Sequence, residues 1–127
     1  MPMQTTSQIL YDGAKNVVMQ FTGVNDGSGG ETLVTKVDVA ALNPVPDTVK
    51  ITEIEYEVSG GIVRMYWDAD DPVEFLDLSS VGEFEYCDIG GLVNAGGAGR
   101  TGNIKFSTIG FDSGSSYSIK LTMKKKF

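Results

Sequence analysis

The stretch "ITEIEYEVSGGIVRMYWD" (residues 51–68) decides the fold class that we predict for this chain. Apolar residues alternate with glutamates over 53–58, and apolar and polar residues alternate again over 63–68. This two-residue period is typical of strands with one buried face. Gly60 and Gly61 stand between the two runs and suit a two-residue hairpin turn, which needs positive φ. The stretch therefore predicts a β-hairpin.

A turn at these two glycines gives one pairing register across the predicted 48–68 hairpin. The register places apolar residues opposite one another on the buried face, and it places one pair of opposite charges on the other face. Trp67 is therefore predicted as a core residue rather than as a platform for binding sugars. The predicted apolar pairs are Ile54–Trp67, Tyr56–Met65 and Val58–Val63, and the predicted outer pairs are Glu57–Arg64, Glu55–Tyr66 and Glu53–Asp68.

The rest of the chain also favours strands. Helical spacing is limited to one turn within 39–46, which Pro44 and Pro46 would end. We predict an all-β fold, a single-domain antiparallel β-sandwich or jelly-roll of about eight short strands over residues 1–127, with 1–7 as an N-terminal arm that could be flexible. Besides the hairpin, strands are expected at 8–12, 16–23, 31–39, 73–78, 83–86, 103–109 and 116–124, the last with an inward row of Tyr117, Ile119, Leu121 and Met123.

The charge of the chain bears on its partners. The net charge is −7, which disfavours nucleic acid because phosphate binding needs a basic face. Acidic residues crowd the segment from Glu53 to Asp88, whereas the basic run 124–126 lies near the end of the chain. Both are expected to be solvated surface, with head-to-tail electrostatic contact between subunits as the alternative. No segment has the length and apolarity of a membrane span or of a signal peptide.

Few residues are suited to catalysis or metal binding. The chain has no histidine, which removes the common general base and metal ligand. Its one cysteine, Cys87, cannot form an internal disulfide; it fits synthesis in a reducing cytoplasm and is expected to pack as a small buried hydrophobe. We predict no enzyme, no metal and no cofactor. The clustered carboxylates leave two alternatives to this prediction: a calcium site that lacks EF-hand spacing, and a hydrolase that uses carboxylates for catalysis. The acids in question are Asp68, Asp70, Asp71, Glu74 and Asp77.

The loop "AGGAGRTGN" (95–103) contains the pattern G-x-G-x-x-G at Gly97, Gly99 and Gly102. A dinucleotide site of this type needs a helix that begins within the motif, because the helix N-terminus holds the pyrophosphate. Here a strand, "NIKFST", is predicted instead. The loop is therefore interpreted as a glycine-rich connection between strands.

Over nearly its full length, the chain resembles small structural proteins of tailed-bacteriophage virions, of the capsid decoration (cement) type. The resemblance implies an all-β domain that binds the surface of a virion, without catalytic residues. It is carried by "YDGAKNVVMQFTG" (11–23), "TKVDVAALNP" (35–44), "VKITEIEY" (49–56), "VRMYWDAD" (63–70), "GGLVNAGGAGRTGNIKFST" (90–108) and "GSSYSIKLTMKK" (114–125).

We therefore expect a non-enzymatic decoration protein, made in the host cytoplasm and bound to the capsid surface. Its expected partners are the major capsid protein or other virion proteins, and further copies of itself, with a trimer as one form; neither nucleic acid nor a membrane is expected. The alternatives are a tail or head–tail connector component, and a carbohydrate-binding β-sandwich module that uses Tyr66. Contacts are expected in the segment 3–10 and the loop 92–102, at Gln8, Ile9, Leu10, Leu92, Val93, Asn94 and Arg100.

Overall fold

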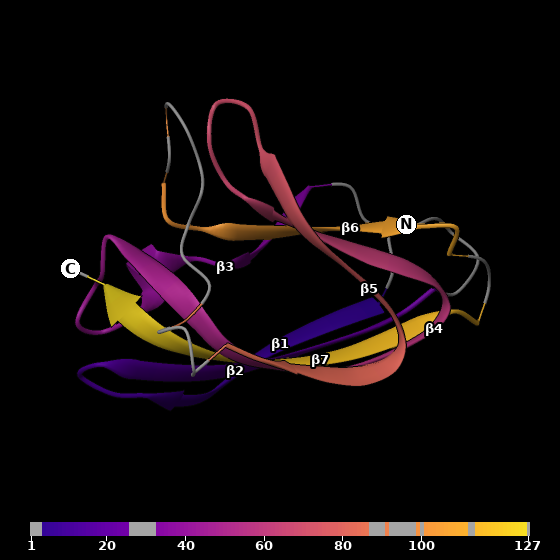
Figure 1. The fold of residues 1–127 in the computed structure, drawn as a ribbon, viewed down its shortest axis with the longest axis horizontal. Coiled ribbons are helices and arrows are strands. Elements are labelled where there is room, and N and C mark those ends of the chain that lie inside the picture. The colour runs from indigo at the N-terminus through magenta and orange to yellow at the C-terminus, as the bar shows by residue number, and fades with distance from the viewer. Residues whose placement is uncertain are drawn as a thin grey trace.

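The computed structural model describes residues 4–25, 33–86, 91, 99, 101–111 and 114–126. These residues form antiparallel strands and a single 3-10 turn, η1, within the segment predicted to hold one helical turn. The predicted all-β class is thus confirmed (Figure 1). The elements are β1 (Gln4–Asp12), β2 (Asn16–Val24), β3 (Val34–Val37), η1 (Val39–Ala41), β4 (Thr48–Trp67), β5 (Val73–Glu85), β6 (Ile104–Ile109) and β7 (Ser116–Lys126).

The strands form one sheet that curls until its two halves face each other. Its order is β1-β2-β7-β4-β6-β3, and β5 pairs with the other side of β4. The first half of β4 pairs with β7 and the second half with β6, so β4 belongs to both halves. In Figure 1 the half that contains β6 lies above the half that contains β2 and β7. This arrangement agrees with the predicted single-domain β-sandwich or jelly-roll.

The predicted hairpin at 48–68 is wrong, because β4 is one strand of 20 residues. Both of its sides are taken by other strands, so its two halves cannot pair with each other. Ile54 lies opposite Phe84 and Leu121, and Trp67 lies opposite Val73 and Ile104. The predicted inward residues are nevertheless buried, with Tyr56 half-buried at the margin.

The two glycines mark a corner in β4 rather than a turn. At this point the neighbour of β4 changes from β7 to β6, and the pairing with β5 shifts between Val58 and Val63. Gly60 has φ of 88°, and the Ser115 hydroxyl donates a hydrogen bond of 3.3 Å to its carbonyl oxygen. A Cβ on Gly61 would lie 2.7 Å from the carbonyl oxygen of Ile109. Glycine is therefore required by close approach of the β6 and β7 ends.

The strand predictions also differ at three other places. Segments 73–78 and 83–86 are parts of a single strand, β5, which bends at Ser80, where φ is 63°. Of the predicted strand 31–39, the described part forms β3 over Val34–Val37. Residues 4–7 of the expected N-terminal arm lie in β1 and pair with β2.

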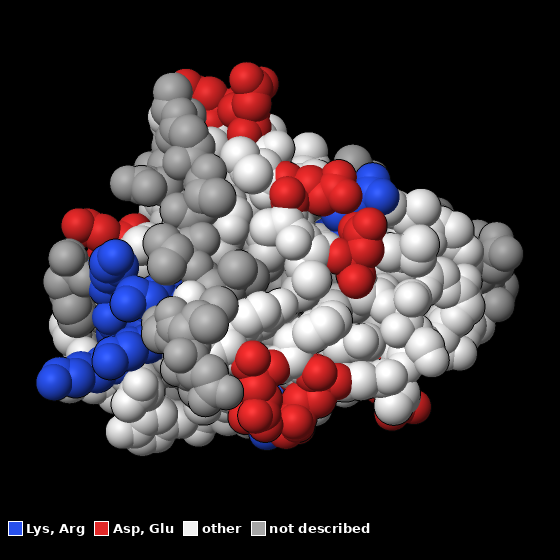
Figure 2. Space-filling view, viewed as in Figure 1, with Lys and Arg blue, Asp and Glu red and all other residues white. Residues whose placement is uncertain are grey.

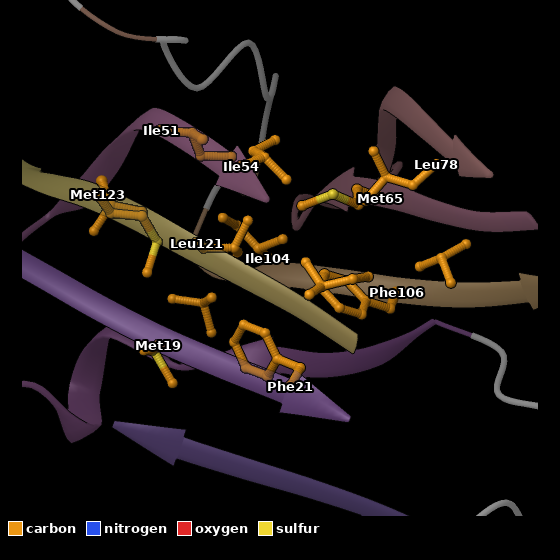
Figure 3. Packing of buried hydrophobic residues seen from close by; sticks show 14 of the residues in the cluster. Met19, Phe21, Ile51, Ile54, Met65, Leu78, Ile104, Phe106, Leu121 and Met123 are labelled. Atoms are coloured by element: carbon orange, nitrogen blue, oxygen red, sulfur yellow. The ribbon is translucent and has the colours of Figure 1, made fainter. Parts of the chain in front are cut away.

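The core lies between the two halves of the sheet. Phe21 of β2 contacts Phe106 of β6 edge to face, with ring centroids 5.3 Å apart, and so joins the halves. Figure 3 shows side chains from both halves directed into this one interior. Trp67 is fully buried and stacks on Phe75 at 4.3 Å, which confirms its predicted core position. The predicted inward row of β7 is also confirmed, since Tyr117, Ile119, Leu121 and Met123 are all buried.

The basic run 124–126 is not wholly solvated surface, as had been expected from its sequence. Lys125 continues the inward row of β7, and its side chain is fully buried. Its Nζ lies 2.6 Å from the Asp12 carboxylate. The other oxygen of that carboxylate accepts a 2.9 Å hydrogen bond from the Asn43 backbone N–H. This ion pair joins the end of β1 to β7 and to the connection before β4. Lys124 and Lys126 are exposed, as expected.

Candidate interaction surface

The structure places the predicted contact residues Gln8, Ile9 and Leu10 on β1, at one edge of the sheet. Among the described strands, β1 pairs only with β2, so its other side presents unpaired backbone N–H and C=O groups. Every side chain from Thr5 to Tyr11 is exposed. The exposed fractions of the large apolar ones are 43% for Ile9, 45% for Leu10 and 57% for Tyr11. These observations define the β1 edge as the candidate surface.

The exposure of β1 includes the face that is directed inward. Ile9 lies opposite Met19, which is only 6% exposed, and Ser7 lies opposite Phe21, which is fully buried. The facing half of the sandwich therefore covers β2 and leaves β1 projecting beyond it. An apolar residue such as Ile9 at an uncovered inward position is typical of a surface that another chain covers.

The β1 edge differs in charge from the opposite edge of the same half-sheet. No charged residue occurs from Gln4 to Tyr11. The opposite edge is formed by β5, which carries the exposed acids Glu83 and Glu85 in this half-sheet. Two more exposed acids of β5, Glu74 and Asp77, lie beside the second half of β4. Figure 2 shows acidic side chains spread over the face in view, most of the basic ones gathered at the end where β7 finishes, and a smaller basic group among the acids. Charged edges resist pairing with other strands, and an uncharged edge does not.

The other predicted contact residues, Leu92, Val93, Asn94 and Arg100, lie outside the described residues. The end of their loop is described and packs against the domain. The Thr101 hydroxyl donates a 2.7 Å hydrogen bond to Asp68, and a Cβ on Gly102 would collide with the carbonyl oxygen of Asp47. Strand β6 follows directly, as predicted. Close backbone approach therefore accounts for Gly102 of the glycine pattern, without a phosphate.

The acids proposed for a calcium site are largely engaged with cations. Arg64 Nε lies 2.8 Å from Asp77 and 3.1 Å from Glu74. The predicted partner of Arg64, Glu57, is thus replaced by residues of β5. Asp68 lies 3.2 Å from Lys105 Nζ. These three carboxylates form ion pairs with two separate cations, Arg64 and Lys105, and do not converge on one point.

A different acidic group does converge, on the outer face of β4 and β5. Carboxylate oxygens of Glu53, Glu55 and Glu83 lie within 4.8 Å of one another, and Lys120 lies 3.3 Å from Glu55. Burial, together with the neighbouring Glu55, raises the pKa of Glu53. The hydrogen bond from Lys120 lowers the pKa of Glu55. A hydrogen bond with Glu85 raises the pKa of Glu83. Exposed acidic groups of this kind are common on proteins without a bound metal ion, so convergence alone does not make this group a metal site.

Two members of this acidic group, Glu55 and Glu83, line a shallow hollow of about 470 Å³ on the outer face of the same half-sheet. Its lining is mostly polar, and the one aromatic ring that reaches it belongs to Tyr56. Tyr66, the expected sugar contact of the carbohydrate-binding alternative, does not line it. The lining residues are Gln20, Glu55, Tyr56, Glu57, Val81, Gly82, Glu83, Ser118 and Lys120.

Within the described part of the chain, no helix is long and apolar enough to cross a membrane. In comparisons with known proteins, no family model, no curated protein and no solved structure matches this chain.

Proposed function

We propose that this protein is a non-enzymatic structural component that acts by binding other protein subunits, as a decoration protein on the capsid of a tailed phage. The single observation that supports subunit binding is the β1 edge. It combines unpaired backbone groups, an uncharged sequence and exposed apolar side chains at Ile9, Leu10 and Tyr11. The virion location is supported by the sequence resemblance.

The physical basis of this function is strand addition. A strand placed beside β1 gains main-chain hydrogen bonds, and the side chains that alternate along it provide specificity. The same contact removes Ile9 and Tyr11 from water, at about 25 cal/mol for each Å² of apolar surface buried. Many symmetric copies on a particle multiply such modest contacts. The loop 92–102, with Arg100 as its polar anchor, is proposed as the second contact region.

The test is the number of copies in purified virions of the phage that encodes the chain, measured by quantitative mass spectrometry. A decoration protein is present in one or more copies per capsomer, whereas a tail or connector component follows the lower symmetry of that structure. Ile9→Lys should lower the number of copies. The matched control is Val81→Lys, at a residue of β5 that is 68% exposed, and it should leave the number unchanged. Absence of the wild-type chain from virions would refute the proposal.

The hollow beside Lys120 favours one second candidate, a carbohydrate-binding module. Its glutamates, glutamine, serine and lysine offer hydrogen-bond donors and acceptors for sugar hydroxyls, beside the ring of Tyr56. Binding of the isolated domain to a glycan array, lost in Gln20→Ala and retained in Ile9→Lys, would favour this candidate over subunit binding.

A further inference from the structure

The described part of the chain leaves three sheet edges open, and they differ in how well they can accept another strand. β3 has four residues, which is too few for a stable contact. β5 is long but carries four exposed acids. β1 has nine residues and no charge before Asp12, which is held by Lys125. Of the three, only β1 is both long and free of charge over its first eight residues, Gln4 to Tyr11.

The nature of the occupant follows from charge. A chain of net charge −7 repels its own copies unless contact occurs away from the acidic surface. If two β5 edges paired, Glu83 and Glu85 of one copy would lie only one strand spacing away from Glu83 and Glu85 of the other copy. Pairing of two β1 edges opposes only Gln, Thr, Ser and Ile side chains. The β1 edge is therefore the described edge at which a second copy meets no like charge.

The order of the half-sheet also separates the acidic edges in such a pair. In each copy the order is β5-β4-β7-β2-β1. Joining two copies through β1 gives a continuous sheet of ten strands with a β5 edge at each end. Nine spacings of about 4.8 Å place these edges roughly 43 Å apart. This is several times the screening length of about 8 Å at physiological ionic strength.

We propose that the β1 edge is occupied by β1 of a second copy, in an antiparallel pair related by a two-fold axis. The proposal rests on the use of β1 that the proposed function assigns, and it names the partner. Regular pairing extends from Gln4 to Ile9, because the register with β2 shifts between Ile9 and Tyr11 and a bulge ends the straight edge. The resulting dimer carries two copies of every other surface and so attaches to a particle through two equivalent sites.

The experiment is sedimentation equilibrium of the full chain, from roughly 1 to 100 µM, a range in which edge contacts of moderate affinity populate a dimer. Wild-type protein should approach twice the monomer mass. Thr6→Lys/Gln8→Lys places lysines on exposed side chains of one face, so the domain stays folded and the dissociation constant of the dimer rises about tenfold or more. The control, Ser79→Lys/Val81→Lys on β5, should dimerise like the wild type.

A charge-complementing variant tests the antiparallel self-pairing itself. Thr6→Glu/Gln8→Glu alone should be monomeric, and its mixture with Thr6→Lys/Gln8→Lys should form a heterodimer. A wild-type chain that stays monomeric over this range, or a dimer that only the β5 variant breaks, would overturn the proposal. The proposed function can fail independently of this proposal. A chain that dimerises but is absent from virions would contradict decoration and leave self-pairing standing. A chain that is present on virions but stays monomeric would contradict self-pairing and leave decoration standing.

Discussion

Replacement of Asp12 by asparagine should destabilise the protein strongly, although Asp12 lies near the end of an edge strand. Lys125 Nζ lies 2.6 Å from the Asp12 carboxylate, and the lysine side chain is fully buried while that of Asp12 is 19% exposed. Asp12→Asn leaves a buried ammonium without its counter-charge. Breaking a buried pair in this way costs about 3–5 kcal/mol, and the residual exposure of Asp12 favours the lower end, about 3 kcal/mol.

This free energy corresponds to a large change in melting temperature. An unfolding entropy of about 2.1 cal/mol/K per residue gives about 0.27 kcal/mol/K for 127 residues. A loss of 3 kcal/mol therefore lowers Tm by about 11 °C, as measured by calorimetry at pH 7. Lys124→Gln, on the exposed neighbour, is the matched control and should change the free energy of unfolding by less than about 0.5 kcal/mol.

The double variant Asp12→Leu/Lys125→Met separates the lost charge partner from lost packing. Apolar residues of similar volume often replace a buried pair at little cost, so this variant should lie within about 1 kcal/mol of the wild type. A loss of less than about 1 kcal/mol in Asp12→Asn would refute the reasoning, because that is the value of a surface pair. It would mean that Lys125 reaches solvent.

The pH dependence should have a definite sign. The Lys125 hydrogen bond lowers the pKa of Asp12 below its ordinary value of 3.8, and the Asn43 N–H adds to the effect. A carboxyl with a lowered folded pKa stabilises the protein above the unfolded pKa. Its contribution is therefore constant from pH 7 down to about 4 and is lost as the pH falls through the folded pKa. In Asp12→Asn, this part of the acid dependence should disappear.

Three further predictions concern the corner, the surface charges and the acidic group. Gly60→Ala should lower the free energy of unfolding, measured in urea, by at least about 1 kcal/mol more than Gly114→Ala. Both residues have φ near 89°, but only at Gly60 would an added Cβ collide with a neighbour, Ser115. Arg64→Met should cost less than about 1 kcal/mol, because its carboxylate partners are 41–48% exposed; a larger loss would contradict this. Because the pKa of Glu53 is raised in the folded protein, stability falls as the pH rises above 4.5, the ordinary pKa of a glutamate. Glu53→Gln should therefore stabilise the protein at pH 7 and not at pH 4. Urea unfolding at the two pH values measures this difference.

The alternation of apolar and polar residues was sufficient to predict most of the buried side chains of β4 and of the inward row of β7. In β4, the apolar residues Ile54, Val58, Val63, Met65 and Trp67 are all in the core. The β1 residues chosen as contacts, Gln8, Ile9 and Leu10, are exposed at an open edge. Alternation determines the face of a strand on which a side chain lies, and that information is local.

The candidate surface itself was only partly predictable. The segment around Ile9 could be chosen from sequence, but its lack of cover depends on how far the facing half of the sheet extends. The burial of Lys125 was missed because three successive lysines suggest solvent, although its position two residues after Met123 continues the inward row of β7. Its partner, Asp12, is more than a hundred residues away in the chain.

By itself, the sequence determined the all-β class, the buried faces and the need for glycine at residues 60 and 61. Only the tertiary structure decided that those glycines form a corner rather than a turn. The inward residues are even-numbered just before Gly60 and odd-numbered after Gly61. A two-residue turn produces this change, and so does a bend in a single irregular strand, so the same sequence pattern fits both. The choice depends on whether β5, β6 and β7 occupy the sides of β4. Backbone hydrogen bonds are alike in every strand, so partners are selected by the packing of the whole core.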